Sequence, residues 1–197
     1  MNVITWWVIS GLFLVVAAAV AGKRSAQRNV LGILIDDRGR FSLSQFQMVL
    51  WTIIVLSLLI GVFIARVSVP GNPLNIDIPD ELLIVMGISI GSAASATAIK
   101  AGKDMDSVSI IGRGKPKFSQ VFLEEEGKTE AVSVTKFQNF WLTLILVAAY
   151  VVTAARAVHA ASVATDPFPL PGFNDTFLIL LGASHAGYLA GKLPKRV

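Results

Sequence analysis

Five stretches of the chain contain no Asp, Glu, Lys or Arg, and their apolar character predicts membrane-spanning helices. They are rich in Leu, Ile, Val, Phe and Ala, have no internal proline, and cover residues 1–22, 41–65, 82–99, 137–155 and 176–191. A spanning helix needs about 20 mostly apolar residues. We therefore predict five helices, over residues 4–21, 45–66, 81–99, 137–157 and 175–191. The last stretch is the shortest, so a re-entrant segment stays open there as an alternative.

The composition agrees with this pattern. Of the 197 residues, 54% are hydrophobic and only 15% are charged, whereas a soluble domain usually carries about 25% charged residues. These numbers predict an all-α integral membrane protein and exclude a disordered chain and an ordinary cytosolic enzyme. The chain has no cysteine, which excludes a disulfide framework, a thiolate zinc site and a thiol nucleophile.

The placement of the basic residues predicts the orientation of the chain. The start MNVITWW carries no positive charge, and the cluster Lys23, Arg24 and Arg28 follows the first apolar stretch. A cleaved signal peptide has its basic residues before the apolar stretch. We therefore expect an uncleaved anchor helix with the N-terminus outside and the C-terminus inside. Trp6 and Trp7 would then lie in the outer aromatic belt.

The remaining charges follow the same topology. Fifteen of the 17 basic residues fall in the segments predicted to lie inside, which are 22–44, 100–136 and 192–197. This distribution satisfies the positive-inside rule. The basic residues that give the net charge of +4 are expected to contact anionic lipid headgroups on the cytoplasmic side. Nucleic acid is therefore not expected as a partner. A protein partner at residues 100–136 stays open.

The chain also matches itself at a distance of about 90 residues. SLSQFQMVLWTIIVL (42–56) aligns with SVTKFQNFWLTLILV (133–147), and DELLIVMGISIGS (80–92) aligns with DTFLILLGASHAG (175–187). Each unit contains two predicted helices, so two copies have the same orientation, and the duplication is parallel. The predicted organisation is an anchor segment (1–29), a first two-helix repeat (30–103), a cytoplasmic linker (104–118) and a second two-helix repeat (119–197).

Small residues recur at helical spacing in the second helix of each unit. They form the candidate helix-packing or pore-lining positions Gly87, Ser89, Gly91, Ser95, Gly182, Ser184, His185 and Ala186. Small residues let helix backbones approach closely in lipid, which favours helix packing. The alternative is a wall of small residues along a pore.

His185 is the ionisable residue placed well inside a predicted span. We expect a neutral histidine bonded to a hydroxyl such as Ser184 or to a backbone carbonyl, with a proton relay as the alternative. The first repeat has Ile90 at the matching position, so the architecture does not require a histidine there.

The first helix of each unit begins with a polar and aromatic motif. Its candidate inner-interface residues are Phe46, Gln47, Phe137 and Gln138. They are interpreted as aromatic anchors and bonding amides, with a paired polar gate as the alternative. Ser42 or Ser44, and Ser133 or Thr135, are expected to cap the two helices.

The acidic runs are interpreted as solvated turn charges. They are Asp36–Asp37 and Glu124–Glu126, which precede Gly39 and Gly127 and lack the ligand spacing of a calcium loop. The segment GRGKPK (112–117) lacks the GK[ST] ending of a phosphate-binding loop. No nucleophile, base and acid come together, so we expect no enzyme, no metal and no cofactor.

The strings GRFSLSQFQMVLWT (39–52) and ELLIVMGISIGSAASA (81–96) resemble a family of bacterial inner-membrane proteins with SLSxFQxxLWT and LLGIS-type helices. FLEEEG (122–127), KFQNF (136–140) and LLGASHAGYLAGK (180–192) resemble its actinobacterial-type branch, which carries a duplicated unit. The resemblance covers residues 30–195. It implies a small multi-pass protein of the bacterial inner membrane and no particular activity.

Two functions are compatible with these features. The first is a non-enzymatic membrane anchor or scaffold that assembles into a homo-oligomer through its small-residue helix faces. The second is an oligomeric pore or channel for ions or small solutes. A membrane enzyme or redox subunit has the least support, because no span contains a buried carboxylate and no catalytic arrangement is visible.

Overall fold

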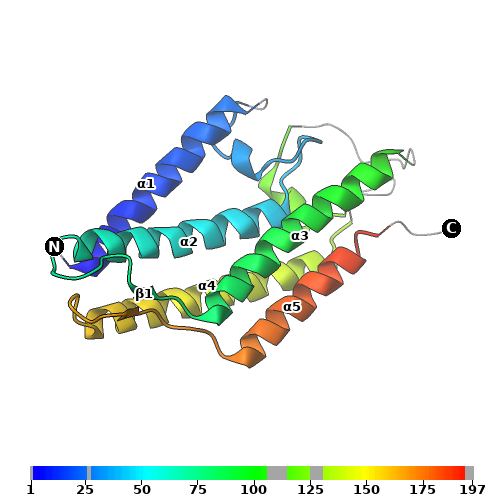
Figure 1. Cartoon of the computed structure of the whole chain (residues 1–197). Helices are drawn as coiled ribbons and strands as arrows, with labels where there is room; N and C mark the ends of the chain where they lie inside the picture. The colour runs from blue at the N-terminus through cyan, green and yellow to red at the C-terminus, as the bar shows by residue number, and fades with distance from the viewer. Residues whose placement is uncertain (1, 26–27, 106–114, 125–130, 194–197) are drawn as a thin grey trace.

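The computed structural model describes residues 2–25, 28–105, 115–124 and 131–193, which are mostly helical (Figure 1). The elements are α1 (Val3–Arg24), the 3₁₀ helix η1 (Gly32–Leu34), α2 (Leu43–Arg66), β1 (Ile76–Asp77), α3 (Asp80–Met105), the 3₁₀ helix η2 (Phe118–Phe122), α4 (Val134–Ala160), β2 (Phe168–Pro169) and α5 (Asp175–Ala190). The prediction of five helices is confirmed, and most boundaries agree within three residues.

The largest difference is the end of α3, which continues to Met105 instead of stopping near residue 99. An apolar stretch marks only the part of a helix that suits a bilayer, whereas backbone hydrogen bonds can continue through charged residues beyond it. Lys100 is the first charged residue beyond the apolar stretch, and its ammonium group pairs with Asp36.

Among the described residues, four helices are long and apolar enough to cross a membrane. They are α1, α2, α3 as far as Gly102, and α4. Helix α5 has 16 residues, which corresponds to about 24 Å at 1.5 Å per residue and is shorter than the hydrocarbon core of about 30 Å. The fifth predicted helix is therefore present but shorter than a typical spanning helix.

The helices form one bundle around a shared apolar core. Helix α1 packs against α2, α2 also contacts α3 and α4, and α5 packs against both α3 and α4 (Figure 1). The centre of the core contains Trp51, Leu58, Val85, Tyr150 and Leu181, each at most 2% exposed. Trp51 and Tyr150 pack edge to face with ring centroids 6.2 Å apart.

The connections gather at two ends of the bundle. We call the end that carries β1 and β2 the strand end, and the end that carries η1 and η2 the turn end. At the strand end, β1 and β2 pair in parallel, with Ile76 opposite Phe168. Buried Arg66 donates hydrogen bonds to the carbonyl oxygens of Val163 and Thr165 and pairs with Asp166 at 2.8 Å. This arginine therefore ties the end of α2 to the loop before β2.

At the turn end, α2 and α4 begin in the same way. Each follows a 3₁₀ helix and a single antiparallel bridge, Ile35 with Phe41 and Leu123 with Val132. Each also has a serine at its N-cap position, as predicted.

The capping bond expected from these serines does not form. The hydroxyl of Ser42 lies 3.1 Å from that of Ser44, and the hydroxyl of Ser133 lies 3.1 Å from Oγ1 of Thr135. Neither serine accepts a hydrogen bond from a backbone amide of its helix. The side chain at residue i+2 offers each serine a closer partner, so the predicted position is correct and the predicted bond is wrong.

Candidate functional site

The small residues predicted on α3 divide between the surface and the interior. Gly87, Gly91 and Ser95 are exposed, and a Cβ added at either glycine would meet no atom within 4 Å. Ser89 instead faces the interior with 1% exposure. The predicted stripe therefore exists, but it has no packing partner within the described part of the chain.

The corresponding residues of α5 show the same division. Ala186 and Gly187 are exposed, and a Cβ at Gly187 would also meet nothing within 4 Å. Gly182 is half-buried, and a Cβ there would lie 3.9 Å from Cδ1 of Ile88 on α3. Because α3 and α5 pack against each other, their exposed small residues lie on neighbouring helices. We call the set Gly87, Gly91, Ser95, Ala186 and Gly187 the small-residue surface.

A polar cluster joins three helices in the interior. The amide nitrogen of Gln47 donates to Oγ1 of Thr143 at 2.6 Å and to Oδ1 of Asn139 at 3.1 Å. Ser184 donates to the same Asn139 oxygen at 3.1 Å. Gln47, Asn139 and Thr143 are fully buried. Hydrogen bonds between buried side chains in an apolar bundle hold the helices in one register, so this cluster fixes α2, α4 and α5 against each other.

The two predicted glutamines do not share this environment. Gln47 is buried in the cluster, whereas Gln138 is exposed on α4. A gate made from paired amides at these two positions has no support in this arrangement. Asn139 and Thr143 were not among the predicted residues; Thr143 aligns with Thr52 in the repeat, which was the available signal.

The two predicted phenylalanines also differ. Phe46 stacks on Phe140 with ring centroids 5.5 Å apart and contacts Phe118 at 6.1 Å. Phe137 is 50% exposed and contacts Trp141 at 6.2 Å. Phe46 is therefore part of the packing at the turn end, and Phe137 keeps the exposed position expected of an aromatic anchor.

His185 is 3% exposed on α5. Neither of its ring nitrogens has a hydrogen-bond partner among the described residues. The hydroxyl of Ser184 bonds to Asn139 rather than to His185, because successive residues on a helix point in directions about 100° apart. The expected bond between Ser184 and His185 is therefore not formed.

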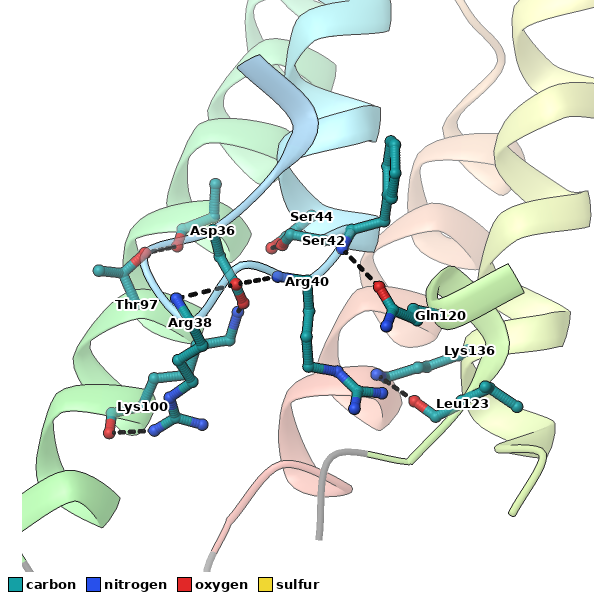
Figure 2. Close-up of polar contacts among 12 residues, drawn as sticks. Asp36, Arg38, Arg40, Ser42, Ser44, Thr97, Lys100, Gln120, Leu123 and Lys136 are labelled. Atoms are coloured by element: carbon teal, nitrogen blue, oxygen red, sulfur yellow. Dashed lines mark hydrogen bonds and ion pairs between the residues drawn. The ribbon is translucent and has the colours of Figure 1, made fainter. Parts of the chain in front are cut away.

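The acidic turn before α2 differs from its prediction as a solvated charge. Asp36 is 8% exposed and forms an ion pair with Lys100, which is also buried (Figure 2). Its other carboxylate oxygen accepts hydrogen bonds from the backbone amides of Arg38 and Arg40 at 3.1 and 2.9 Å. Only Asp37, which is exposed, fits the prediction. The turn positions the Asp36 carboxylate to anchor α3.

Further contacts join this turn to the segment before α4. Arg40 donates to the carbonyl oxygen of Glu124 at 3.3 Å. Lys136 donates to that of Leu123 at 2.7 Å (Figure 2). Gln120 accepts from the backbone amide of Phe41 at 3.3 Å. The turn before α2 and the residues from Gln120 to Glu124 therefore form one polar layer at the turn end. Most of the predicted linker 104–118, and Glu125 and Glu126, lie outside the described residues.

The long apolar helices, with their charged side chains gathered at the two ends, define the chain as a helical membrane protein. Groups of three or more His, Asp or Glu side chains that could hold a metal ion do not occur in the part that the structure describes. Comparison of the chain with protein-family models, with curated proteins and with solved structures finds no match.

Proposed function

We propose that the chain is a non-enzymatic, multi-pass membrane scaffold that assembles into a homo-oligomer through its small-residue surface, in the inner membrane of a bacterium. The observation that carries this proposal is the open space above Gly87, Gly91 and Gly187. Glycine in a helix interior costs about 1 kcal/mol relative to alanine. Glycines with no close neighbour in the protomer are therefore expected to contact a neighbour outside it.

Other glycines of the same bundle do have close neighbours within the protomer. A Cβ at Gly22 would lie 2.5 Å from the carbonyl oxygen of Val30, and one at Gly61 would lie 2.6 Å from the backbone nitrogen of Trp7. These glycines allow close packing within the protomer. Gly87 and Gly91 have the same residue type without such a contact, which fits close approach of a second copy in lipid.

We also propose that the two helical units arose by parallel duplication. The matching entries into α2 and α4 support this. The amide of Ser42 donates to the carbonyl oxygen of Leu34 at 2.9 Å, and the amide of Ser133 donates to that of Phe122 at 2.8 Å. The parallel pairing of β1 with β2 joins equivalent loops of the two units.

Cysteine cross-linking tests the oligomer. The natural chain has no cysteine, so Ser95→Cys introduces a single thiol on the small-residue surface. Oxidation in native membranes is expected to give a cross-linked dimer, because copies that meet there bring two equivalent thiols together. Val16→Cys on exposed α1 is the matched control and should remain uncross-linked.

A second variant checks the glycine contact itself. Gly91→Ile in the Ser95→Cys background should abolish the cross-link without lowering the thermal unfolding temperature of the protomer, because this position is open and isoleucine favours a helix over glycine. A chain that stays monomeric in membranes and in mild detergent contradicts the scaffold proposal. Solute flux through reconstituted liposomes, blocked by Gly91→Ile, would instead favour a pore between protomers.

We propose that the strand end faces outside and the turn end faces the cytoplasm, because the basic residues concentrate at the turn end. Ser162→Cys and Ser119→Cys place a thiol at exposed positions of the two ends. In intact cells, a membrane-impermeant maleimide is expected to label Ser162→Cys at once and Ser119→Cys only after permeabilisation. The reverse labelling would overturn the orientation.

A further inference from the structure

Helices α1 and α2 touch near the strand end and diverge toward the turn end (Figure 1). Near the strand end, the indole nitrogen of Trp7 donates to Oγ of Ser57 at 3.0 Å. Gly61 lies against the backbone of Trp7 in the same region. The two helices are therefore fixed together at one end, and a wedge of space opens between them toward the other.

The segment around η1 closes the wide end of this wedge. Gly22 and Gly32 pack backbone to backbone, since a Cβ at Gly32 would clash with the carbonyl oxygen of Gly22. The hydroxyl of Ser25 also donates to that oxygen at 2.6 Å. The end of α1 and the η1 segment are thus held against each other, and η1 also contacts α2.

A cavity of about 210 Å³ remains between α1, the η1 segment and α2. Its lining consists only of apolar side chains, among them Val15 and Ala19 of α1, Ile33 of η1, and Val49 and Ile53 of α2. Dry apolar cavities of about 150 Å³ already accept a molecule such as benzene. This larger cavity, which is open on one side, has the character of a site for a hydrocarbon chain.

Basic residues lie next to this cavity. Val15, Ala19 and Lys23 follow one another at intervals of four residues, so they share one face of α1. Lys23 lies about 6 Å beyond Ala19 along the helix axis, at 1.5 Å per residue. Lys23 and Arg24 are exposed and form no hydrogen bond or ion pair within the described ranges. The rim of the apolar cavity thus presents the Lys23 cation, and Arg24 is the next residue along the chain.

We propose that this cavity and its rim bind an anionic phospholipid, with one acyl chain in the cavity and the phosphate at Lys23 and Arg24. The short distance between the apolar cavity and the basic residues matches a phospholipid, because this lipid carries its negative charge directly above its hydrocarbon chain. A second copy of the chain fits less well as the occupant, since its own Lys23 and Arg24 would approach the same basic rim. The site is separate from the small-residue surface, so its test is independent of the scaffold proposal.

Native mass spectrometry of protein extracted from mixed liposomes tests this site. The liposomes contain equal amounts of phosphatidylglycerol, which is anionic, and phosphatidylcholine, which is neutral overall. The natural chain is expected to retain one phosphatidylglycerol in preference to phosphatidylcholine. Ala19→Phe fills the cavity and is expected to reduce retention of both lipids by about tenfold or more, since each lost methylene contact weakens lipid binding.

The rim is tested by Lys23→Gln/Arg24→Gln. This variant should lose the preference for phosphatidylglycerol while still retaining phosphatidylcholine, because the cavity is unchanged. The matched controls are Ala17→Phe, on an exposed position of α1, and Lys115→Gln/Arg156→Gln, which removes the same charge from exposed sites outside the cavity lining. Both controls should behave like the natural chain.

Three results would overturn the proposal. They are unchanged lipid retention in Ala19→Phe, an equal loss in Ala17→Phe, and an undiminished phosphatidylglycerol preference in the rim variant. Glycerol phosphate, added as a soluble headgroup without chains, should not displace the lipid. Displacement by it would show a simple phosphate site rather than a lipid site.

Discussion

Replacing Lys100 with methionine is expected to lower the free energy of unfolding by about 3 kcal/mol, the lower end of the range for breaking a buried ion pair. The side chains of Lys100 and Asp36 are each 6% exposed, so the variant leaves a buried carboxylate without its cation. The carboxylate keeps two backbone amide donors, from Arg38 and Arg40, which limits the loss. Thermal unfolding in mild detergent, followed by circular dichroism, measures the effect.

Two further variants separate the ion pair from other effects of the substitution. Asp36→Asn/Lys100→Met removes both charges and keeps an oxygen that can accept the same two amide bonds, so it should recover most of the lost stability. Asp37→Asn changes the neighbouring exposed acid and should alter stability by less than about 0.5 kcal/mol. If Lys100→Met unfolds at the same temperature as the natural chain, the ion pair does not stabilise α3 against the turn.

The helices were predictable because a bilayer imposes a local rule on the sequence. A spanning segment must satisfy its backbone within itself and expose apolar side chains, so the absence of charge marks each helix regardless of its neighbours. The rule says nothing about residues beyond the bilayer, which is why the end of α3 at Met105 was missed. The same rule does not distinguish a spanning helix from a shorter apolar helix such as α5, which has 16 residues.

The environments of the polar residues were not predictable from their motifs, because packing with distant segments decides them. Gln47 and Gln138 occupy the same motif, yet Gln47 is buried and Gln138 is exposed. Gln47 on α2 faces Asn139 and Thr143 of α4, whereas Gln138 comes one residue before Asn139 and so points about 100° away from it. The motif of Asp36, an acid in a glycine turn, does not indicate its ion pair either, because the partner Lys100 lies 64 residues later in the sequence.

Replacing Gly61 with alanine is expected to separate α1 from α2 near the strand end. The new Cβ would lie 2.6 Å from the backbone nitrogen and 2.7 Å from Cα of Trp7. Backbone atoms cannot rotate away as a flexible side chain can, so α1 itself must move. Overpacking of this kind costs about 1–3 kcal/mol, and the movement should also break the bond from Trp7 to Ser57. Thermal unfolding and the emission spectrum of the tryptophans report the two effects.

Gly11→Ala is the matched control, because it changes the same residue type on the other side of the same helix contact. A Cβ at Gly11 would lie 3.7 Å from Cβ of Ser57, which is an ordinary van der Waals distance that requires no movement of α1. Alanine also favours a helix over glycine by about 1 kcal/mol, so this variant should be as stable as the natural chain or more stable. Equal stabilities for the two variants would show that the contact of Gly61 with the backbone of Trp7 does not limit the position of α1.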